Sequence, residues 1–351
     1  MSAQLRFGVW ALVYGNWASF HHPEDPVDAS WERNRRQILQ AEELGYDSTL
    51  LAQHVINPFG EQYDQLDTWT AAAALAALTE RIEIIAAIKP YLYHPVVLAK
   101  QALQIEEISR GRFGINLVNA WFKPELERAG IGFAEHDERY AYGTEWLRVV
   151  RGLLAGERVS FRGEHFHIDD YQLKPASGHR HRPAVYVGGE SDPARALAAD
   201  LADTWFINGQ PQQDVRALID DVASRPREGD PLRYALSAFV IARETGAEAQ
   251  EVLAYQWELA EQGKRAWDGL VANADPKAVM FHTFAKHPHI GTNGGTAAGL
   301  VGSYDAVAER ILQFRRLGIG TLMLQFQPFE SEQRRFAHEV IPRYRRLEGA
   351  G

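Results

Sequence analysis

Short apolar runs rich in β-branched residues alternate with segments of helical periodicity almost from one end of the chain to the other. This alternation is typical of a parallel sheet whose strands are joined by helical crossovers. We expect eight strands, at residues 5–12, 47–52, 82–88, 113–118, 184–187, 204–207, 234–242 and 321–325. The pattern therefore predicts an α/β fold, a single (β/α)8 TIM barrel that takes up residues 1–351.

The helical segments between these strands are amphipathic. Trp31, Ile38, Ala41 and Leu44 share one face of the first helix, which should end at Gly45. Further helices are expected at 69–78, 95–109, 138–154 and 304–317. Residues 159–168 instead alternate around Gly163, which predicts a β-hairpin outside the barrel.

One connection is much longer than a crossover requires. It takes up residues 246–302 and contains a segment rich in Gly, Thr, Asn and Ala at 291–299. Long connections in a compact barrel are usually functional or mobile. We therefore expect an insertion that covers the active site, with residues 263–300 acting as a lid.

Charge and composition narrow the class of partner. The chain has 37 Lys and Arg against 46 Asp and Glu, a formal charge of −9, which argues against nucleic-acid binding. It has no cysteine, which excludes disulfides and thiolate chemistry and fits a cytoplasmic protein. Neither an export signal nor an apolar run of membrane length is present, so we expect no membrane partner and a small-molecule substrate.

The residues at the carboxyl ends of the expected strands should form the active site of such a barrel. They are rich in amides and glycines and poor in carboxylates. The set is Gln53, His54, Lys89, Pro90, Asn116, Asn119, Gly188, Gly189, Glu190, Asn208, Gln325 and Gln327. Amides at these positions suit a polar heterocycle, whose ring edge offers hydrogen-bond donors and acceptors but little charge.

Two common kinds of barrel enzyme fit these strand ends poorly. A glycosidase needs two opposed carboxyl groups, and a metallohydrolase needs clustered His and Asp ligands. Three histidine pairs occur at i,i+2 spacing, but no carboxylate converges on any of them, so we expect no metal site. The site should bind an organic cofactor or substrate.

Three segments carry candidate binding residues, and each also has an ordinary structural interpretation. The run VGGES at 187–191 opens a helix after a strand, where glycines and free N–H groups suit a phosphate, although a plain turn with a capping Ser191 also explains it. The carboxylate of Glu190 opposes a dianion unless it points away. Residues 116–125 can be packing around a strand end, and 136–140 can be a charged first helical turn.

Four blocks taken together resemble the bacterial luciferase-like flavin-dependent monooxygenases, and the resemblance covers nearly the whole chain. They are LTERIEIIAA at 78–87, ISRGRFGINLV at 108–118, EHDERY at 135–140 and VGGES at 187–191. The resemblance implies an enzyme that binds FMN as FMNH2, delivered by a separate NAD(P)H:FMN reductase, and uses O2 to oxygenate its substrate. It also implies a homodimer or homotetramer.

The resemblance further implies roles for particular residues. Asn116 would contact the flavin ring edge and Glu125 would support it. Arg139 and Tyr140 would line the FMN site, and Gly189 and Ser191 would hold the phosphate. Gln53 or His54, after the second strand, would lie near the flavin. We take Asn116 and His54 as the candidate catalytic residues.

Within the family the chain is most similar to the branch that contains the dimethylsulfone, alkanesulfonate and pyrimidine monooxygenases. The active sites of the sulfonate enzymes in this branch resemble anion-binding sites. They have cationic residues at the positions that correspond to Ser237, Phe239 and Asn293 of this chain. Burying a sulfonate without a cation is costly, so we expect a small neutral organosulfur substrate such as dimethylsulfone. Lys89 and Arg243 could supply that cation, but we expect both to be engaged elsewhere.

Other functions remain as alternatives. The segments LVNAWFKPE at 117–125 and LVGSY at 300–304 are similar to the pyrimidine enzyme, and an alkanesulfonate enzyme of the same family is a further alternative. A deazaflavin-dependent hydride-transfer enzyme shares the barrel, and a non-catalytic flavin-binding protein would bind FMN without turnover. No G-x-G-x-x-G run follows the first strand, so a nicotinamide site is not expected.

Overall fold

The computed structural model describes residues 4–349 and contains a closed barrel of parallel strands. Around the barrel the strands follow the order β1, β12, β9, β8, β7, β4, β3, β2. Their bounds are β1 (Arg6–Trp10), β2 (Ser48–Leu51), β3 (Glu83–Ile88), β4 (Phe113–Leu117), β7 (Ala184–Gly188), β8 (Thr204–Ile207), β9 (Arg233–Phe239) and β12 (Ile319–Gln325). The predicted (β/α)8 barrel is confirmed.

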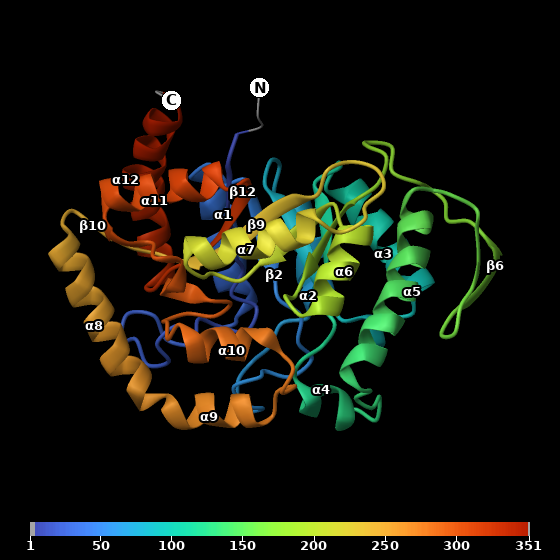
Figure 1. The fold of residues 1–351 in the computed structure, drawn as a ribbon, viewed down its shortest axis with the longest axis horizontal. Helices are drawn as coiled ribbons and strands as arrows, with labels where there is room; N and C mark the ends of the chain where they lie inside the picture. The colour runs from blue at the N-terminus through green and yellow to red at the C-terminus, as the bar shows by residue number, and fades with distance from the viewer. Residues whose placement is uncertain (1–3, 350–351) are drawn as a thin grey trace.

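Helices surround the barrel and bury its outer face (Figure 1). They are α1 (Trp31–Glu43), α2 (Thr68–Leu78), α3 (Pro95–Ile108), α5 (His136–Leu154), α6 (Asp192–Leu201), α7 (Gln212–Ala223), α11 (Tyr304–Arg316) and α12 (Phe329–Gly349), with a short α4 at Lys123–Glu127 and a 3-10 turn, η1, at Pro90–Leu92. Ser30 caps α1 by accepting from the backbone N–H of Arg33. Gly45, predicted as the end of this helix, follows it in a left-handed conformation. Across residues 4–349, no helix combines the length and apolarity that a membrane span would need.

The barrel interior is filled by its own side chains. Leu50, Ile85, Tyr186, Phe206 and Met323 form a buried cluster inside the sheet. A Cβ on Gly8 would lie 2.7 Å from the methyl carbon of Met323, so a larger residue there would force that side chain to shift. The interior is therefore a packed core, and open space for a ligand occurs at its end.

The predicted seventh strand differs from the observed structure. A single strand was expected at 234–242, but β9 ends at Phe239 and a separate β10 (Ile241–Arg243) leaves the barrel. Strand β10 pairs with β11 (Val301–Ser303), the strand that closes the long insertion. Because both β9 and β10 are buried, the apolar run continues across the break between them. The sequence pattern therefore does not show that the chain changes its strand partner there.

The predicted hairpin is present as β5 (Val159–Arg162) and β6 (His167–Tyr171) and lies at the edge of the molecule beside α5 (Figure 1). The carboxylate of Glu145 accepts from the backbone N–H groups of Glu164, His165 and Phe166 in its turn. These bonds fasten the hairpin to α5, away from the carboxyl ends of the barrel strands.

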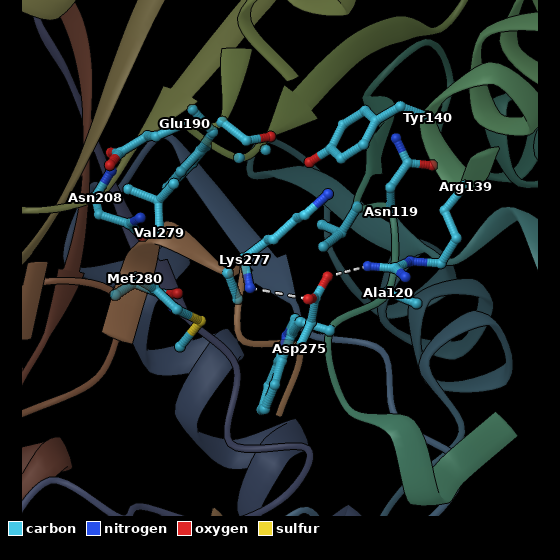
Figure 2. Close-up of a pocket in the computed structure, with 18 of the residues that line it drawn as sticks. Asn119, Ala120, Arg139, Tyr140, Glu190, Asn208, Asp275, Lys277, Val279 and Met280 are labelled. Carbon is cyan, nitrogen blue, oxygen red and sulfur yellow. Dashed lines mark hydrogen bonds and ion pairs between the residues drawn. The ribbon is translucent and has the colours of Figure 1, made fainter. Parts of the chain in front are cut away.

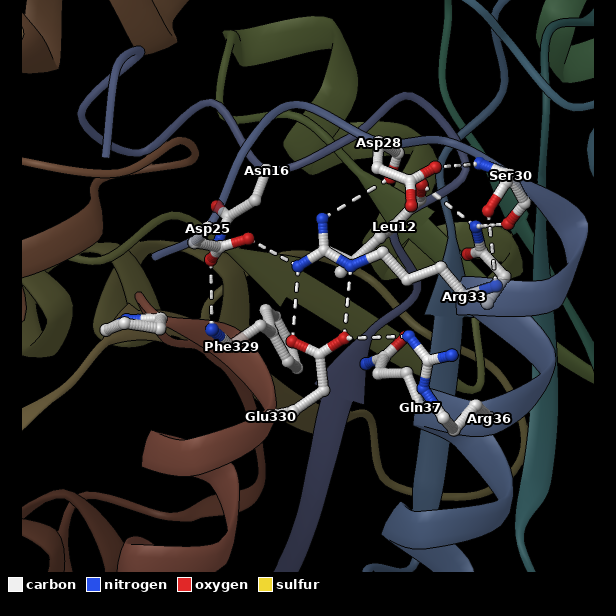
Figure 3. A network of polar contacts seen from close by, with 12 residues as sticks. Leu12, Asn16, Asp25, Asp28, Ser30, Arg33, Arg36, Gln37, Phe329 and Glu330 are labelled. Carbon is white, nitrogen blue, oxygen red and sulfur yellow. Dashed lines mark hydrogen bonds and ion pairs between the residues drawn. The ribbon is translucent and has the colours of Figure 1, made fainter. Parts of the chain in front are cut away.

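A buried ionic network joins the first and last βα units (Figure 3). The guanidinium of Arg33 contacts Asp25 and also makes a two-bond pair with Glu330, at 3.1 and 3.2 Å. Asp25 also accepts from the backbone N–H of Phe329 at 2.9 Å and from the amide of Asn16 at 2.6 Å. The network therefore holds the start of α12 against the loop after β1, where the barrel closes.

The insertion forms α8 (Gly246–Gln262), α9 (Lys264–Ala272), α10 (Val279–Lys286) and a 3-10 turn, η2, at Gly295–Ala298. Figure 1 shows α8, α9 and α10 along one end of the molecule. Near its middle the insertion is attached to the loop after β4, through a bridge between Phe122 and Ala274 and a 2.7 Å bond from Asp275 N–H to Trp121 O. Near its end, Gly209 N–H donates to Asn293 O at 2.8 Å.

Candidate functional site

Two adjoining cavities open between the carboxyl ends of the strands and the insertion. They enclose about 770 and 750 Å³, part of it open to solvent, which is the usual size of a ligand site. The first, which we call the polar cavity, is lined among others by Asn119, Arg139, Tyr140, Gly189, Glu190, Ser191 and Lys277. The second, the aromatic cavity, is lined among others by Tyr14, Gln53, His54, Phe59, Lys89 and Trp267. Trp10, Asn116, Val118, Trp121, Met280 and Asn293 line both.

Several buried polar atoms around the polar cavity lack a hydrogen-bond partner. They are Oδ1 of Asn116, both amide atoms of Asn119, Oγ of Ser191 and Nε of Arg139. Buried polar groups in native proteins are almost always paired, and each exception calls for an explanation. Their concentration around one cavity indicates a polar ligand that would supply the missing partners.

The loop from Gly189 to Ser191 brings its backbone close to this cavity. Gly189 has a φ of 115°, and a Cβ there would lie 3.0 Å from the hydroxyl of Tyr140. Helix α6 starts directly after Ser191, which lines the cavity, so the start of the helix lies next to it. A helix start of this kind suits a phosphate or another anion. Burial raises the pKa of Tyr140, which keeps its hydroxyl protonated as a donor.

Glu190 lies in the same loop, and its side chain is engaged with the next strand end. Its Oε1 accepts from the backbone N–H of Asn208 at 2.7 Å and from the amide of Gln210 at 3.1 Å. Burial raises the pKa of Glu190 to about 7. The carboxylate that was expected to oppose an anion unless it pointed away is therefore turned toward Asn208 and is half protonated near neutral pH.

Arg139 reaches the polar cavity with its charge already paired (Figure 2). One amino group contacts the carboxylate of Asp275, from the insertion, and the other donates to Ala134 O at 2.6 Å. The guanidinium also lies 4.0 Å from the ring centre of Phe133. Its charge is thus compensated by the protein itself.

His54, Lys89 and Glu125 form a buried group beside the aromatic cavity. Lys89 Nζ contacts Oε2 of Glu125 and lies 3.1 Å from Nδ1 of His54. Burial and the nearby Lys89 hold the pKa of His54 well below its usual value, so the ring is neutral. Because an ammonium only donates, Nδ1 must accept, and the ring proton is on Nε2. His54 thus offers an N–H donor.

The structure brings most of the predicted site residues together. Asn116 lines both cavities, Gln53 and His54 line the aromatic one, and Arg139, Tyr140, Gly189 and Ser191 line the polar one. Glu125 lines neither, since it lies behind Lys89 and accepts from the backbone N–H of Val55.

Of the residues used to predict a neutral substrate, some line the cavities and others do not. Asn293 lines both cavities, whereas Ser237 and Phe239 are buried and line neither. Arg243 is turned away and pairs with Glu332 at 2.6 Å. Lys89 lines the aromatic cavity, but its charge is paired with Glu125. Both cations are thus engaged, as expected.

Sequence reasoning missed the contribution of the insertion to the lining. Trp267, Leu270, Lys277, Val279 and Met280 all line one or both cavities. The length of the insertion predicted a cover, but periodicity gave no indication of which of its side chains would face inward. Residues 264–280 hold one aromatic residue and two lysines, and no pattern in this segment marked the positions that line the cavities.

Comparison with known proteins agrees with this architecture. Residues 6–321 match the family model described as luciferase-like monooxygenase. An FMNH2-dependent dimethylsulfone monooxygenase of Pseudomonas putida is 30% identical over 368 residues, covering 99% of this chain and 97% of that protein.

Two solved structures share the fold. The long-chain alkane monooxygenase has a TM-score of 0.81 at 19% identity, covering 99% of this chain and 92% of that one. DmoA from Hyphomicrobium sulfonivorans has a TM-score of 0.78 at 16% identity, covering 99% of this chain and 89% of that one. The family match takes in most of the barrel, its strand ends and the insertion. The chain belongs to the luciferase-like monooxygenase family.

Proposed function

We propose that this protein is an FMNH2-dependent monooxygenase that uses O2 to oxygenate a small neutral organosulfur compound such as dimethylsulfone. The observation that carries the proposal is the set of unpartnered buried polar atoms around the polar cavity, next to an aromatic cavity whose one lysine is neutralised. The similarity to dimethylsulfone monooxygenases supports it.

Reduced FMN fits the residues of the polar cavity. The unpartnered oxygen of Asn116 and the unpartnered amide of Asn119 offer acceptors and a donor for the polar atoms of a flavin ring edge. The backbone of Gly189, the hydroxyls of Ser191 and Tyr140 and the start of α6 match a phosphate. When bound, reduced FMN supplies the reaction with O2 from which the transferred oxygen comes. Glu125 would act from behind, by holding Lys89.

The substrate would occupy the aromatic cavity. Tyr14, Phe59, Trp121 and Trp267 line it, and the charge of Lys89 is compensated by Glu125. A sulfonate entering this space would lose its hydration without gaining a free cation, which costs several kcal/mol. A sulfone needs only one or two donors, and His54 Nε2–H is one.

His54 and Asn116 are the proposed catalytic residues. His54, neutral and with its proton on Nε2, would donate to an oxygen of the substrate and fix its orientation. Asn116 lines both cavities and would hold the flavin edge at the boundary with the substrate. Oxygenation would then depend on holding reduced FMN and the substrate side by side while the insertion excludes water.

A separate NAD(P)H:FMN reductase is the proposed source of reduced FMN. The chain has no glycine-rich nucleotide fingerprint after β1 that would hold a nicotinamide cofactor. The enzyme would therefore take up reduced flavin from solution. We also propose that it works as a cytoplasmic homodimer or homotetramer and needs no membrane or nucleic-acid partner.

The test is a substrate panel under one supply of reduced FMN and O2. Dimethylsulfone, methanesulfonate, a longer alkanesulfonate and uracil are assayed side by side, and mass spectrometry detects the added oxygen atom. Turnover of the sulfone above the sulfonates is expected. Turnover of a sulfonate without the sulfone would contradict the charge argument, and turnover of uracil alone would move the protein to the pyrimidine branch. Flavin binding without any turnover would identify a binding protein.

A further inference from the structure

We propose that Lys277, in the insertion, supplies the positive charge for the phosphate of reduced FMN, and that Arg139 instead anchors the insertion to the barrel. This inference rests on the proposed function. It assigns the two cations of the polar cavity different tasks: Lys277 would select FMN over a flavin without phosphate, whereas Arg139 would position the segment that carries Lys277.

The contacts of Arg139 leave its charge little to offer a ligand. Its side chain is 2% exposed, one amino group contacts Asp275, and the other donates to a backbone carbonyl. Only Nε lacks a partner. A guanidinium paired in this way presents a nearly neutral surface to a dianion, because the carboxylate of Asp275 lines the same cavity.

Asp275 connects this ion pair to Lys277. Its Oδ2 contacts Arg139, while its Oδ1 accepts from the backbone N–H of Lys277 at 2.9 Å. Its own N–H donates to Trp121 O at 2.7 Å, and the next N–H in the turn, that of Ala278, donates to Asp275 O at 2.9 Å. The backbone around Lys277 is therefore fixed to the barrel through one carboxylate.

The side chain of Lys277 is comparatively free to bind. Figure 2 shows it extending into the cavity from the insertion, in the direction of Tyr140. Its nearest carboxylate is Asp137, 4.0 Å away and itself 81% exposed, so the pair is weak and screened by solvent. Among the described residues, Arg139 and Lys277 are the Lys and Arg side chains lining the polar cavity. Lys277 is thus the cation there whose charge remains available.

The electrostatics of the cavity require such a cation. Glu190 and Asp275 both line it, and the Asp275 charge is matched by Arg139 while that of Glu190 has no ion-pair partner there. A phosphate dianion added beside Ser191 would meet net negative charge unless Lys277 offsets it. An ammonium is a flexible point charge that can follow the phosphate as the ligand settles.

The experiment compares reduced FMN with reduced riboflavin, which has the same ring system and no phosphate. Anaerobic titrations are run on the wild type, on Lys277→Gln and on the control Lys264→Gln, whose lysine is exposed on α9 and pairs weakly with Asp268 at 3.5 Å. Lys277→Gln should weaken FMN binding about tenfold and leave riboflavin binding unchanged, since a hydrogen bond to a charged group is lost. The control should change neither affinity.

A second variant separates the two cations. The double change Arg139→Gln with Asp275→Asn removes both charges together, so no unpaired buried charge remains. It should weaken FMN binding more than riboflavin binding, because the backbone that holds Lys277 at the phosphate loses its anchor. Adding Lys277→Gln to the double variant should then cost much less than the tenfold loss expected in the wild-type background, since Lys277 is no longer held in place. The same loss from Lys277→Gln in both backgrounds, or equal FMN affinity in Lys277→Gln and wild type, would overturn the inference. If the wild type binds neither flavin, the proposed function itself has failed.

Discussion

Lys89 Nζ lies 3.1 Å from Nδ1 of His54 and also contacts the carboxylate of Glu125, with all three side chains buried. One ammonium thereby compensates a buried carboxylate and determines which nitrogen of the neighbouring imidazole is protonated. The contact therefore affects both the stability of the fold and the chemistry of His54. Its two consequences can be measured separately, since unfolding reports on the ion pair and turnover reports on His54.

Breaking the ion pair should be costly. Lys89→Met leaves Glu125 buried without a cation, and we expect the free energy of unfolding to fall by about 3–5 kcal/mol. Urea denaturation measures this loss. The double variant Lys89→Met with Glu125→Gln removes both charges and should recover much of it. A double variant no more stable than the single one would contradict this account of the pair.

Negative charge at the start of α6 should impair flavin binding. Ser191→Asp places a carboxylate at the proposed phosphate position, and reduced FMN should bind about tenfold more weakly or worse because of like-charge repulsion. Ser191→Ala is the control and should have a smaller effect, since it removes only one hydroxyl. Anaerobic titration gives both affinities. Unchanged affinity in Ser191→Asp would show that this loop does not bind the phosphate.

FMN affinity should depend on the protonation of Glu190, whose pKa burial raises to about 7. At pH 6 the group is mostly neutral, and at pH 8 it is mostly ionised. Reduced FMN should therefore bind more tightly at pH 6 than at pH 8. Glu190→Gln retains an oxygen that can accept from Asn208 and should flatten this dependence. Equal pH profiles for the wild type and the variant would rule Glu190 out as the cause.

Stability should fall in mild acid because of His289. Burial lowers the pKa of this ring to about 4, against 6.5 for the free side chain. Between these values the unfolded chain binds a proton that the folded chain does not, so the free energy of unfolding decreases as pH falls from about 6.5 to about 4. The shift corresponds to roughly 3 kcal/mol. Urea titrations at several pH values should show a shallower slope for His289→Asn, while the exposed His338→Asn leaves it unchanged.

Limited proteolysis should cut the insertion first. Within the proposed lid, 263–300, the cuts should fall in 263–289, because the later part is held by bonds such as Thr292 N–H to Gln325 Oε1 at 3.0 Å. Reduced FMN with dimethylsulfone should slow cleavage. Mass spectrometry of the fragments locates each cut. Equal cleavage rates with and without the ligands would show that this segment is not a lid.

Much of the barrel was predictable from local pattern. Its strands are short, buried and apolar, and caps such as Ser30 mark the helices between them. The break between Phe239 and Ile241 was not predictable, since it depends on pairing with β11, sixty residues further along the chain. Helix α12 was also missed, because its many charged residues obscure the apolar positions that it buries, among them Phe336, Val340 and Tyr344.

The site was predictable wherever its residues follow a barrel strand. Gln53, Asn116 and Gly189 line the cavities because parallel strands end at one edge. The partners of charged residues were not predictable. The pairing of Arg139 with Asp275 joins positions 136 residues apart, and nothing in the local sequence of either marks the other.

The attachment of Asp275 to the barrel also changes the entropy of closing the insertion. Asp275 stands near the middle of residues 246–302, with Trp267 and Leu270 of the aromatic cavity before it and Lys277 and Val279 of the polar cavity after it. Halving a free loop lowers its closure cost by only about 0.6 kcal/mol, but it also makes the two halves separate units. Each half can then order or open separately: Trp267 and Leu270 before Asp275 line the aromatic cavity, whereas the half after it contacts both cavities through Met280 and Asn293.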